Sequence, residues 1–218
     1  MVSSCRSKKE NPVKRHLVLF ALGFLLVQTL APAALAERKP YALDRSHCQL
    51  NFIGEALLIS AHGSFDKWDA DVQIDRDKLE NSALSLTIDA ASINTRVERR
   101  DNHLRSPDFL DVKNHPQTKF VSTKVTLVDD KTLNLLGDLT IRGTTKPVQV
   151  PVKVVFMRPE DARFKGDLQI NRKDFGVNYN SKMNPIEDMI TVQFDFHLVD
   201  QQAMQQRQQN RPAQPPPN

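Results

Sequence analysis

Side chains that could act as acids, bases or metal ligands are few and far apart in this chain. Beyond residue 36 its histidines are His47, His62, His103, His115 and His197. None belongs to a His-x-His, His-Glu-x-x-His or Cys-x-x-Cys pattern, so a metal site would have to assemble from distant strands, and none is expected. His47, His103 and His115 fall at predicted loops or strand ends, where they could meet at one opening. His197 lies on the polar side of an alternating segment, which favours a solvated histidine.

Ionisable side chains are densest at residues 99–111, which read RRDNHLRSPDFLD. The spacing predicts a helix over 96–105, with Asp101 and Arg105 four positions apart as in an ion pair, and Pro107 should end it. Asp101, His103 and Ser106 are the residue types of a hydrolytic triad. Side chains two positions apart on one short helix diverge, so this segment alone does not supply a triad.

Motifs for nucleotide or acyl chemistry are missing from the sequence. It contains no Gly-x-Ser-x-Gly elbow, no P-loop and no Gly-x-Gly-x-x-Gly, and it has only 7 glycines. A phosphate cradle needs such glycines, and an esterase-type nucleophile needs such an elbow. We therefore expect neither a cofactor nor an enzyme.

Apolar and polar residues alternate with period two over most of residues 49–199, as in half-buried antiparallel strands. Apolar rows occupy 84–88, 121–127, 133–141, 148–156 and 190–198, with shorter pieces near 50–53, 72–74 and 168–170. In the second row, Val121, Val125 and Leu127 are expected to share one face. About eight such strands form either a sandwich or a closed barrel. The segment from Ile190 to Leu198 would span roughly 30 Å at ~3.3 Å per residue, which favours a barrel.

Four segments interrupt or follow the strand pattern. Proline cannot donate to a ladder, so we expect an edge, a bulge or a gap near Pro151. Residues 75–81 fit one turn of helix, and residues 183–188 fit a loop. Residues 201–218 are rich in Gln, Asn and Pro without an apolar period, which predicts a disordered tail.

Residues 1–36 have the features of a secretory signal peptide. Five Lys and Arg side chains precede an apolar run at 17–27, and Ala34-Leu35-Ala36 is a small-x-small cleavage site. We expect export to the bacterial periplasm without a stable membrane anchor. Residues 1–36 hold 5 of the 30 basic and 1 of the 26 acidic residues, so 25 of each remain. A domain without net charge does not attract a phosphate backbone in general, so nucleic-acid binding is not expected.

Cys48 is the single cysteine beyond residue 36, so no intramolecular disulfide can form there. We expect it to lie on a strand as a small apolar residue; a reactive thiol or a bridge in a homodimer is the alternative. About 160 residues of domain can bury one core without disulfides. In a barrel, the apolar rows could either fill the interior or line a cavity.

A series of short motifs runs in order along residues 41–199. They are Tyr41-Ala-Leu-Asp44, His47, Phe52, Gly63-Ser-Phe65, Ser92-Ile-Asn-Thr95, Arg100-Asp-Asn-His-Leu-Arg-Ser106, Asp108-Phe109, His115-Pro116, Phe120, residues 137–148, Asn171-Arg172 and Asp174-Phe175-Gly176. Together they resemble the YceI-like family of secreted, lipocalin-like, polyisoprenoid-binding proteins. Two positions depart from the family pattern: Ala56 stands where a second histidine is common, and Cys48 stands where serine is usual.

The resemblance implies that residues 37–200 form an all-β, antiparallel, eight-stranded lipocalin-like barrel with one or two short helices. It also implies which residues meet a ligand: His47, Phe52, Arg100, His103, Arg105, Phe109, Phe120, Phe194 and Phe196. For Arg100, Asp101, His103 and Arg105 two interpretations stay open. They either hold a ligand head group at the mouth or clamp a salt-bridged helix across the barrel end.

The function expected on these grounds is an exported protein that holds a polyisoprenoid or a similar long apolar lipid as carrier or buffer, without catalysis. One alternative is an envelope enzyme that acts on a lipid or quinone with His47 and His103 as acid and base. Another is a ligand-free interaction module that uses the Gln- and Pro-rich tail.

Overall fold

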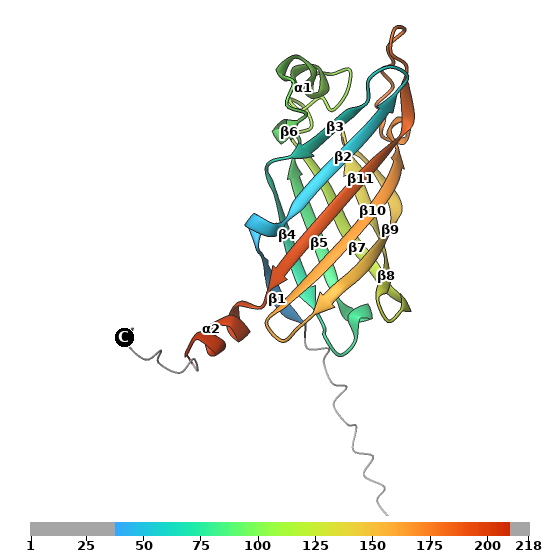
Figure 1. Ribbon diagram of the computed structural model, residues 1–218. Coiled ribbons are helices and arrows are strands. Elements are labelled where there is room, and N and C mark those ends of the chain that lie inside the picture. Colours follow the sequence, from blue (N-terminus) through green and yellow to red (C-terminus); the bar gives the residue numbers. More distant parts are fainter. Residues whose placement is uncertain (1–37, 210–218) are drawn as a thin grey trace, which may run out of the picture. The chain divides into compact units, whose positions relative to one another are not determined.

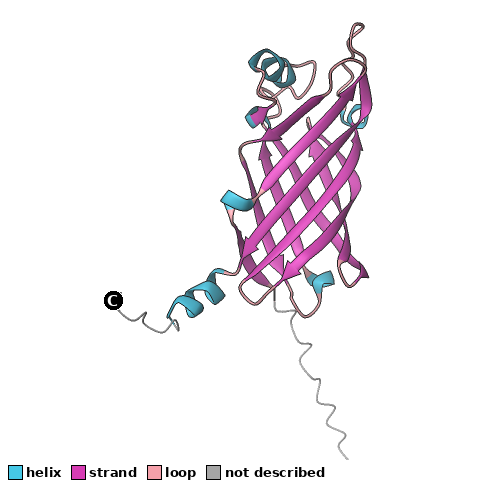
Figure 2. Ribbon diagram, in the orientation of Figure 1, coloured by secondary structure: helices cyan, strands magenta, loops and turns pink. Residues whose placement is uncertain are grey.

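The computed structural model describes residues 38–209, and its strands form one antiparallel sheet, seen in Figure 1 and, by secondary structure, in Figure 2. The strands are β1 (Lys39–Leu43), β2 (Gln49–Ala56), β3 (Ala61–Phe65), β4 (Trp68–Ile74), β5 (Ala83–Asp89), β6 (Ile93–Asn94), β7 (Gln117–Asp129), β8 (Thr132–Ile141), β9 (Thr144–Met157), β10 (Asp161–Asn171) and β11 (Ile186–Val199). The helical segments are the short turns η1 (Arg45–His47), η2 (Leu79–Asn81), η3 (Ala90–Ser92) and η4 (Arg172–Phe175), and the helices α1 (Glu98–Arg105) and α2 (Gln201–Gln209).

The sheet closes on itself as a barrel with eight strand positions. Paired neighbours run β1–β4–β5–β7–β8–β9–β10–β11, and β11 pairs back with β1 through Ala42 and Val199. Three positions are each shared by two short strands. At the first of these positions β1 and β2 both pair with β11. At the second, β4 pairs with β1 and β3 pairs with β2. At the third, β5 pairs with β4 and β6 pairs with β3. The expected eight-stranded antiparallel barrel with short helices is confirmed.

The apolar rows of the sequence face the barrel interior. Ile190, Val192, Phe194, Phe196 and Leu198 of β11 all point inward, and Leu133, Leu135 and Leu139 of β8 are buried with them. Leu86 and Ile88 of β5 and Val150, Val152 and Val154 of β9 complete the same layer. The period-two pattern therefore assigns the inner face correctly for these strands.

In β7 the expected row is wrong at Val121 and at Leu127, which is 42% exposed, and right at Val125. Val121 is 47% exposed, whereas Phe120 is buried at 6% and Val125 at 6%. The side that faces inward changes between Phe120 and Val125 because the pairing of β7 with β8 shifts between Ser122 and Lys124. A β-bulge adds one residue to one strand, and the side chains beyond it then point to the opposite face.

The irregularity expected near Pro151 is present between β9 and β10. Arg163 pairs with Phe156 but the next residue, Phe164, pairs with Val154, so the register shifts by one residue there. The pairing of the two strands then ends at Lys153 and Lys165. On its other side Pro151 stays in register with Asn134 of β8. On the β10 side, Pro151 therefore lies beyond the last paired residue of β9, where a residue that cannot donate a backbone hydrogen bond is tolerated.

Two local expectations need correction, and two others hold. The loop expected over 183–188 is wrong for its last residues, because β11 begins at Ile186, which pairs with Ala56. The tail expected to be disordered begins instead with α2, whose Gln202 and Ala203 amides both donate to Asp200 Oδ1 at 3.0 Å. Glutamine is a good helix former, and this N-cap is enough to start the helix. The helix expected over 96–105 and the turn expected over 75–81 are found as α1 and η2.

Two sequence-based predictions concern the ends of the chain. Residues 1–36, the expected signal peptide, and 210–218 lie outside the described part of the chain. Within residues 38–209, no helix combines the length and the apolar character needed to cross a bilayer.

Candidate functional site

The barrel encloses a cavity of about 500 Å³. This volume lies within the range of roughly 300–1,000 Å³ that is usual for small-molecule sites. Its walls are aliphatic and aromatic side chains from all round the ring, including Leu50, Leu86, Leu135, Val152 and Val192. The apolar rows therefore line a hollow interior instead of filling it.

Three phenylalanine rings lie along the barrel wall because a neighbouring strand offers each of them a glycine. The pairs are Phe52 with Gly63 of β3, Phe120 with Gly137 of β8, and Phe194 with Gly166 of β10. A Cβ atom added to any of these glycines would lie 2.5 Å from the Cζ atom of its phenylalanine. Packed interiors do not accept such an overlap, so a larger residue would displace the ring toward the cavity. These glycines keep bulky side chains against the wall and the interior open.

At one end of the cavity, three aromatic rings lie beside side chains that can form hydrogen bonds. His103 lies edge-on to Phe109 and Tyr179, with ring centroids 5.0 and 4.7 Å away, and the Phe109 and Tyr179 rings are 5.1 Å apart. Arg100 of α1 and Asn184 line the same cavity, and Figure 1 places α1 at one end of the barrel. Among the described residues, no aspartate, glutamate or lysine lines the cavity. This end can donate hydrogen bonds to a polar group of a ligand.

Helix α1 is fastened to the barrel by hydrogen bonds to the backbone. Asp101 is buried, and its Oδ1 accepts from the Thr95 amide at 2.8 Å and from the Thr95 hydroxyl at 2.5 Å. Arg105 donates from Nε to the Ala91 carbonyl at 2.7 Å and from Nη2 to the Ile93 carbonyl at 2.6 Å. The expected Asp101–Arg105 ion pair is therefore wrong, since each side chain has a different backbone partner. These contacts favour the interpretation in which the two residues clamp the helix.

Seven of the nine residues expected to meet a ligand line the cavity: Phe52, Arg100, His103, Phe109, Phe120, Phe194 and Phe196. The other two, His47 and Arg105, do not. Arg105 turns away to the Ala91 and Ile93 carbonyls, and His47 lies on η1, where its Nδ1 is 2.8 Å from Asp44 Oδ2.

His47, His103 and His115, which could have met at one opening, do not: of the three only His103 lines the cavity, and each has a different carboxylate partner. His103 Nε2 lies 2.9 Å from Asp108 Oδ2, and His115 Nε2 lies 3.9 Å from Asp111 Oδ2. The Ser106 hydroxyl donates to the His103 carbonyl, not to its ring. The structure therefore brings together neither the hydrolytic triad nor the His47–His103 acid/base pair that an enzyme would need.

The sequence analysis named neither Arg172 nor Tyr179 as a ligand residue, although both line the cavity. Arg172 is buried, and its Nη1 donates to the carbonyls of Val177 and Tyr179 at 2.8 and 2.7 Å. The signal available in the sequence was the Asn171-Arg172 motif of the series; in the structure it stands where β10 ends, and the buried guanidinium there needs several carbonyl partners. Arg172 holds the 177–179 segment, and with it the Tyr179 ring, over the cavity.

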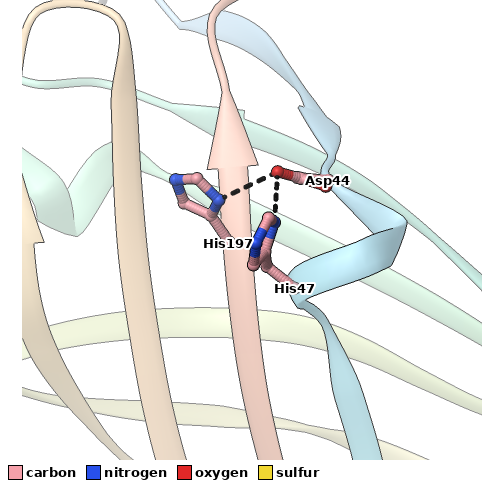
Figure 3. A group of neighbouring side chains, drawn as sticks. All are labelled: Asp44, His47 and His197. Carbon is pink, nitrogen blue, oxygen red and sulfur yellow. Dashed lines mark hydrogen bonds and ion pairs between the residues drawn. The ribbon is translucent and has the colours of Figure 1, made fainter.

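A second group of polar side chains lies at the corner between β1 and β2, shown in Figure 3. Asp44 Oδ2 is 2.8 Å from His47 Nδ1 and 3.2 Å from His197 Nδ1. Hydrogen bonds from Ser46 and His47 lower the pKa of Asp44 to about 2. His197 Nε2 is 3.0 Å from Asp161 Oδ2, and only 19% of the His197 side chain is exposed. The expectation of a solvated His197 is wrong, because strand pairing places its ring between two carboxylates.

Cys48 is half-buried beside this group. Its thiol donates to the His197 carbonyl at 3.3 Å, and burial raises the pKa of the Cys48 thiol. A thiol with a raised pKa is a poor nucleophile at neutral pH. The expected role as a small residue on a strand is wrong in position only, since Cys48 immediately precedes β2.

Residues 41–198 match the family model of the YceI-like domain. A UPF0312 protein of Pseudomonas savastanoi pv. phaseolicola is 35% identical over 175 residues, covering 76% of this chain and 88% of that protein. Among solved structures, Burkholderia cenocepacia BcnA superposes with a TM-score of 0.67 at 26% identity, covering 71% of this chain and 98% of BcnA. A polyisoprenoid binding domain from Saccharophagus degradans superposes with a TM-score of 0.58 at 15% identity, covering 73% and 98%, and shows the shared fold.

Proposed function

This chain belongs to the YceI-like family, and from that premise we propose that it binds a long apolar lipid of the polyisoprenoid class inside its barrel. The observation that carries the proposal is the hollow, apolar interior behind a hydrogen-bonding end. The Saccharophagus degradans domain of the same fold is described as polyisoprenoid binding, which supports this class of ligand.

The size of the cavity suits a few isoprene units. One molecule of liquid water occupies ~30 Å³. If each carbon atom takes the same volume, a cavity of about 500 Å³ holds about 16 carbons, or about three isoprene units. Burial of each methylene contributes ~0.8 kcal/mol, so three units supply about 12 kcal/mol before the costs of ordering. Micromolar or tighter binding needs about 8 kcal/mol. The rest of a longer chain would extend from the mouth.

We propose that the protein carries or buffers this lipid without changing it. Among the described residues, His103 is the single histidine in the cavity lining, and its partner Asp108 is not part of that lining. An acid and a base placed on one substrate are what general acid–base catalysis requires. With its predicted signal peptide, the protein would act in the periplasm after export.

The test is native mass spectrometry of the protein purified from its own cell envelope, followed by organic extraction. We expect a stoichiometric polyprenyl or quinone-like mass. A Leu135→Trp variant places a large ring in the cavity lining and should lose that mass. Leu136→Trp is the matched control, because Leu136 is 43% exposed and the next residue of the same strand.

Each outcome separates the alternatives. A protein that remains without lipid after incubation with polyprenyl lipids rejects the carrier function. An equal loss of lipid in both tryptophan variants would assign the lipid to another surface. Turnover of an envelope lipid that disappears on replacement of His103 would favour the enzyme.

A further inference from the structure

We propose that Asp44, His47 and His197 form a binding site for a divalent transition-metal ion of the zinc class. Their donor atoms, one from each side chain, all lie within 4.8 Å of one another. They come from the residue between β1 and η1, from η1 itself and from β11, as Figure 3 shows. Zinc binds nitrogen and oxygen at about 2.0–2.1 Å in a tetrahedron, so its ligands lie roughly 3.3 Å apart. The distances from Asp44 Oδ2 to the two imidazoles, 2.8 and 3.2 Å, need little change.

Neighbouring groups already orient two of the three donors. Asp44 Oδ1 accepts from the Ser46 amide at 3.2 Å and from the Ser46 hydroxyl at 2.6 Å, which leaves Oδ2 directed at the histidines. His197 Nε2 contacts Asp161, so its Nδ1 is the atom that points to the site. A carboxylate on the second nitrogen of a histidine is the usual outer support of a metal ligand.

The types of the donor atoms and their exposure to solvent indicate which ion the site would bind. Two imidazoles and one carboxylate suit Zn²⁺, whereas Mg²⁺ and Ca²⁺ prefer oxygen ligands alone. The His47 side chain is 68% exposed, so solvent reaches the site and water can complete the coordination. An ion held there would join the corner between β1 and β2 to β11, and we infer a stabilising role.

Isothermal titration of the chelator-treated protein with zinc chloride tests the site. We expect one Zn²⁺ per chain, no competition by Mg²⁺, and a higher melting temperature with zinc. His47→Gln should weaken binding at least tenfold, and it should fold because the residue is exposed. His62→Gln is the control, since His62 is an exposed histidine of β3. No binding, or an equal loss in both variants, overturns the proposal and leaves a hydrogen-bonded structural group.

A different observation carries a second inference, which concerns the surface beside the cavity mouth. Four large apolar side chains are exposed there: Leu57 at 74%, Leu58 at 69%, Ile59 at 71% and Met183 at 85%. We call these four residues the apolar lip. Such grouped exposure marks an interaction site. We infer that the apolar lip docks on the surface of a lipid bilayer.

Hydrogen bonds hold the two segments of the apolar lip together. The Leu58 amide donates to Asn184 Oδ1 at 2.7 Å, the Leu57 amide donates to the Pro185 carbonyl at 3.0 Å, and Asn184 Nδ2 donates to the Ile59 carbonyl at 3.1 Å. Figure 1 shows the β2–β3 connection and the segment before β11 side by side at the end that carries α1. The lip is therefore one surface built from two connections.

Charge and position favour a bilayer as the partner. Residues 56–62 and 177–185 contain no aspartate or glutamate, and Lys182 places a positive charge in the second segment. The flanking carboxylate of Glu55 accepts a hydrogen bond from the Ser60 hydroxyl. Apolar side chains that enter the head-group boundary and a lysine that meets anionic lipid are the two parts of interfacial binding. Ile59 and Asn184 also line the cavity, so the docked lip would bring the mouth to the membrane. Transfer of lipid at that contact rests on the proposed function; docking does not.

Flotation of the full chain with vesicles of three parts phosphatidylcholine to one part phosphatidylglycerol tests the docking. We expect a Leu57→Ser/Leu58→Ser/Met183→Ser variant to lose at least tenfold in the fraction bound while it keeps any lipid in its cavity. The matched control is Leu127→Ser/Val128→Ser, at positions 42% and 56% exposed near the β7–β8 turn. Equal binding by both variants overturns the inference. A Leu135→Trp protein that still floats would separate docking from the cargo.

Discussion

The contact between Phe120 and Gly137 is one of three that hold a phenylalanine ring against the barrel wall. We expect Gly137→Ala to lower the free energy of unfolding by about 1–3 kcal/mol, because its methyl group would overlap both the Phe120 ring and the Val121 carbonyl. The displaced ring should also lower lipid occupancy. Gly54→Ala is the control, since the nearest atom to a Cβ there is Ile190 Cδ1 at 3.5 Å. Urea unfolding checks both variants, and equal stability of the two would show that Phe120 adjusts freely.

Asp44 makes the stability of the barrel depend on acid pH. Its pKa is lowered from 3.8 to about 2 in the folded protein, mainly by the Ser46 hydroxyl and then by His47. The ionised carboxylate therefore stabilises the fold above pH 4, and this contribution is lost as the pH falls from about 3.8 through about 2. We expect Asp44→Asn to be less stable than the parent at pH 6, and we expect this difference to shrink as the pH falls from about 3.8 towards 2. Urea unfolding in the presence of a chelator measures both, with Asp138→Asn as the exposed control; a difference independent of pH would contradict the assignment.

At the scale of the element, α1 depends on Arg105. Arg105→Ala removes hydrogen bonds to the Ala91 and Ile93 carbonyls, and charged hydrogen bonds that are partly exposed are worth about 1–2 kcal/mol together. We expect a lower melting temperature and unchanged lipid affinity of the folded protein, because Arg105 does not line the cavity. Arg99→Ala, an exposed arginine of the same helix, controls for the loss of charge. Lost lipid affinity at an unchanged melting temperature would instead place Arg105 at a ligand head group.

The elements that the sequence predicts well are those governed by local chemistry. Period-two alternation identifies the inner row of β11, and Pro107 correctly limits α1. The predicted inner row of β7 fails at Val121, since a bulge depends on the pairing with β8, and the sequence of one strand alone does not indicate it. The start of α2 is not predicted because the expectation for the tail rests on its content of Gln, Asn and Pro. That content does not take account of a single N-cap residue such as Asp200.

At the scale of the whole molecule, ring closure decides which candidate residues meet. Four of the aromatic residues expected in the cavity lie there because each occupies the inner face of a strand: Phe52, Phe120, Phe194 and Phe196. Phe109 reaches the cavity from the turn that follows α1. The predicted contact of His47 with a ligand is wrong because His47 lies on η1. This turn connects β1 to β2, two strands that share one position of the barrel. His197 acquires Asp44 and Asp161 as partners from residues more than 30 positions away. Closure of a sheet brings such residues together, and no sequence spacing records it.

The boundary of the barrel at Asp200 leads to a last prediction. Deletion of residues 201–218 should change neither the melting temperature nor the bound lipid, because no buried residue of α2 supports the barrel among the side chains described. Deletion of 199–218 is the matched control. It removes Val199, which pairs with Ala42 and Asp161 where the barrel closes, and should destabilise the fold. Thermal unfolding and native mass spectrometry of both proteins check this. If the shorter deletion abolished binding of a protein partner and left an empty barrel unchanged, the tail would be the functional part and the protein an interaction module.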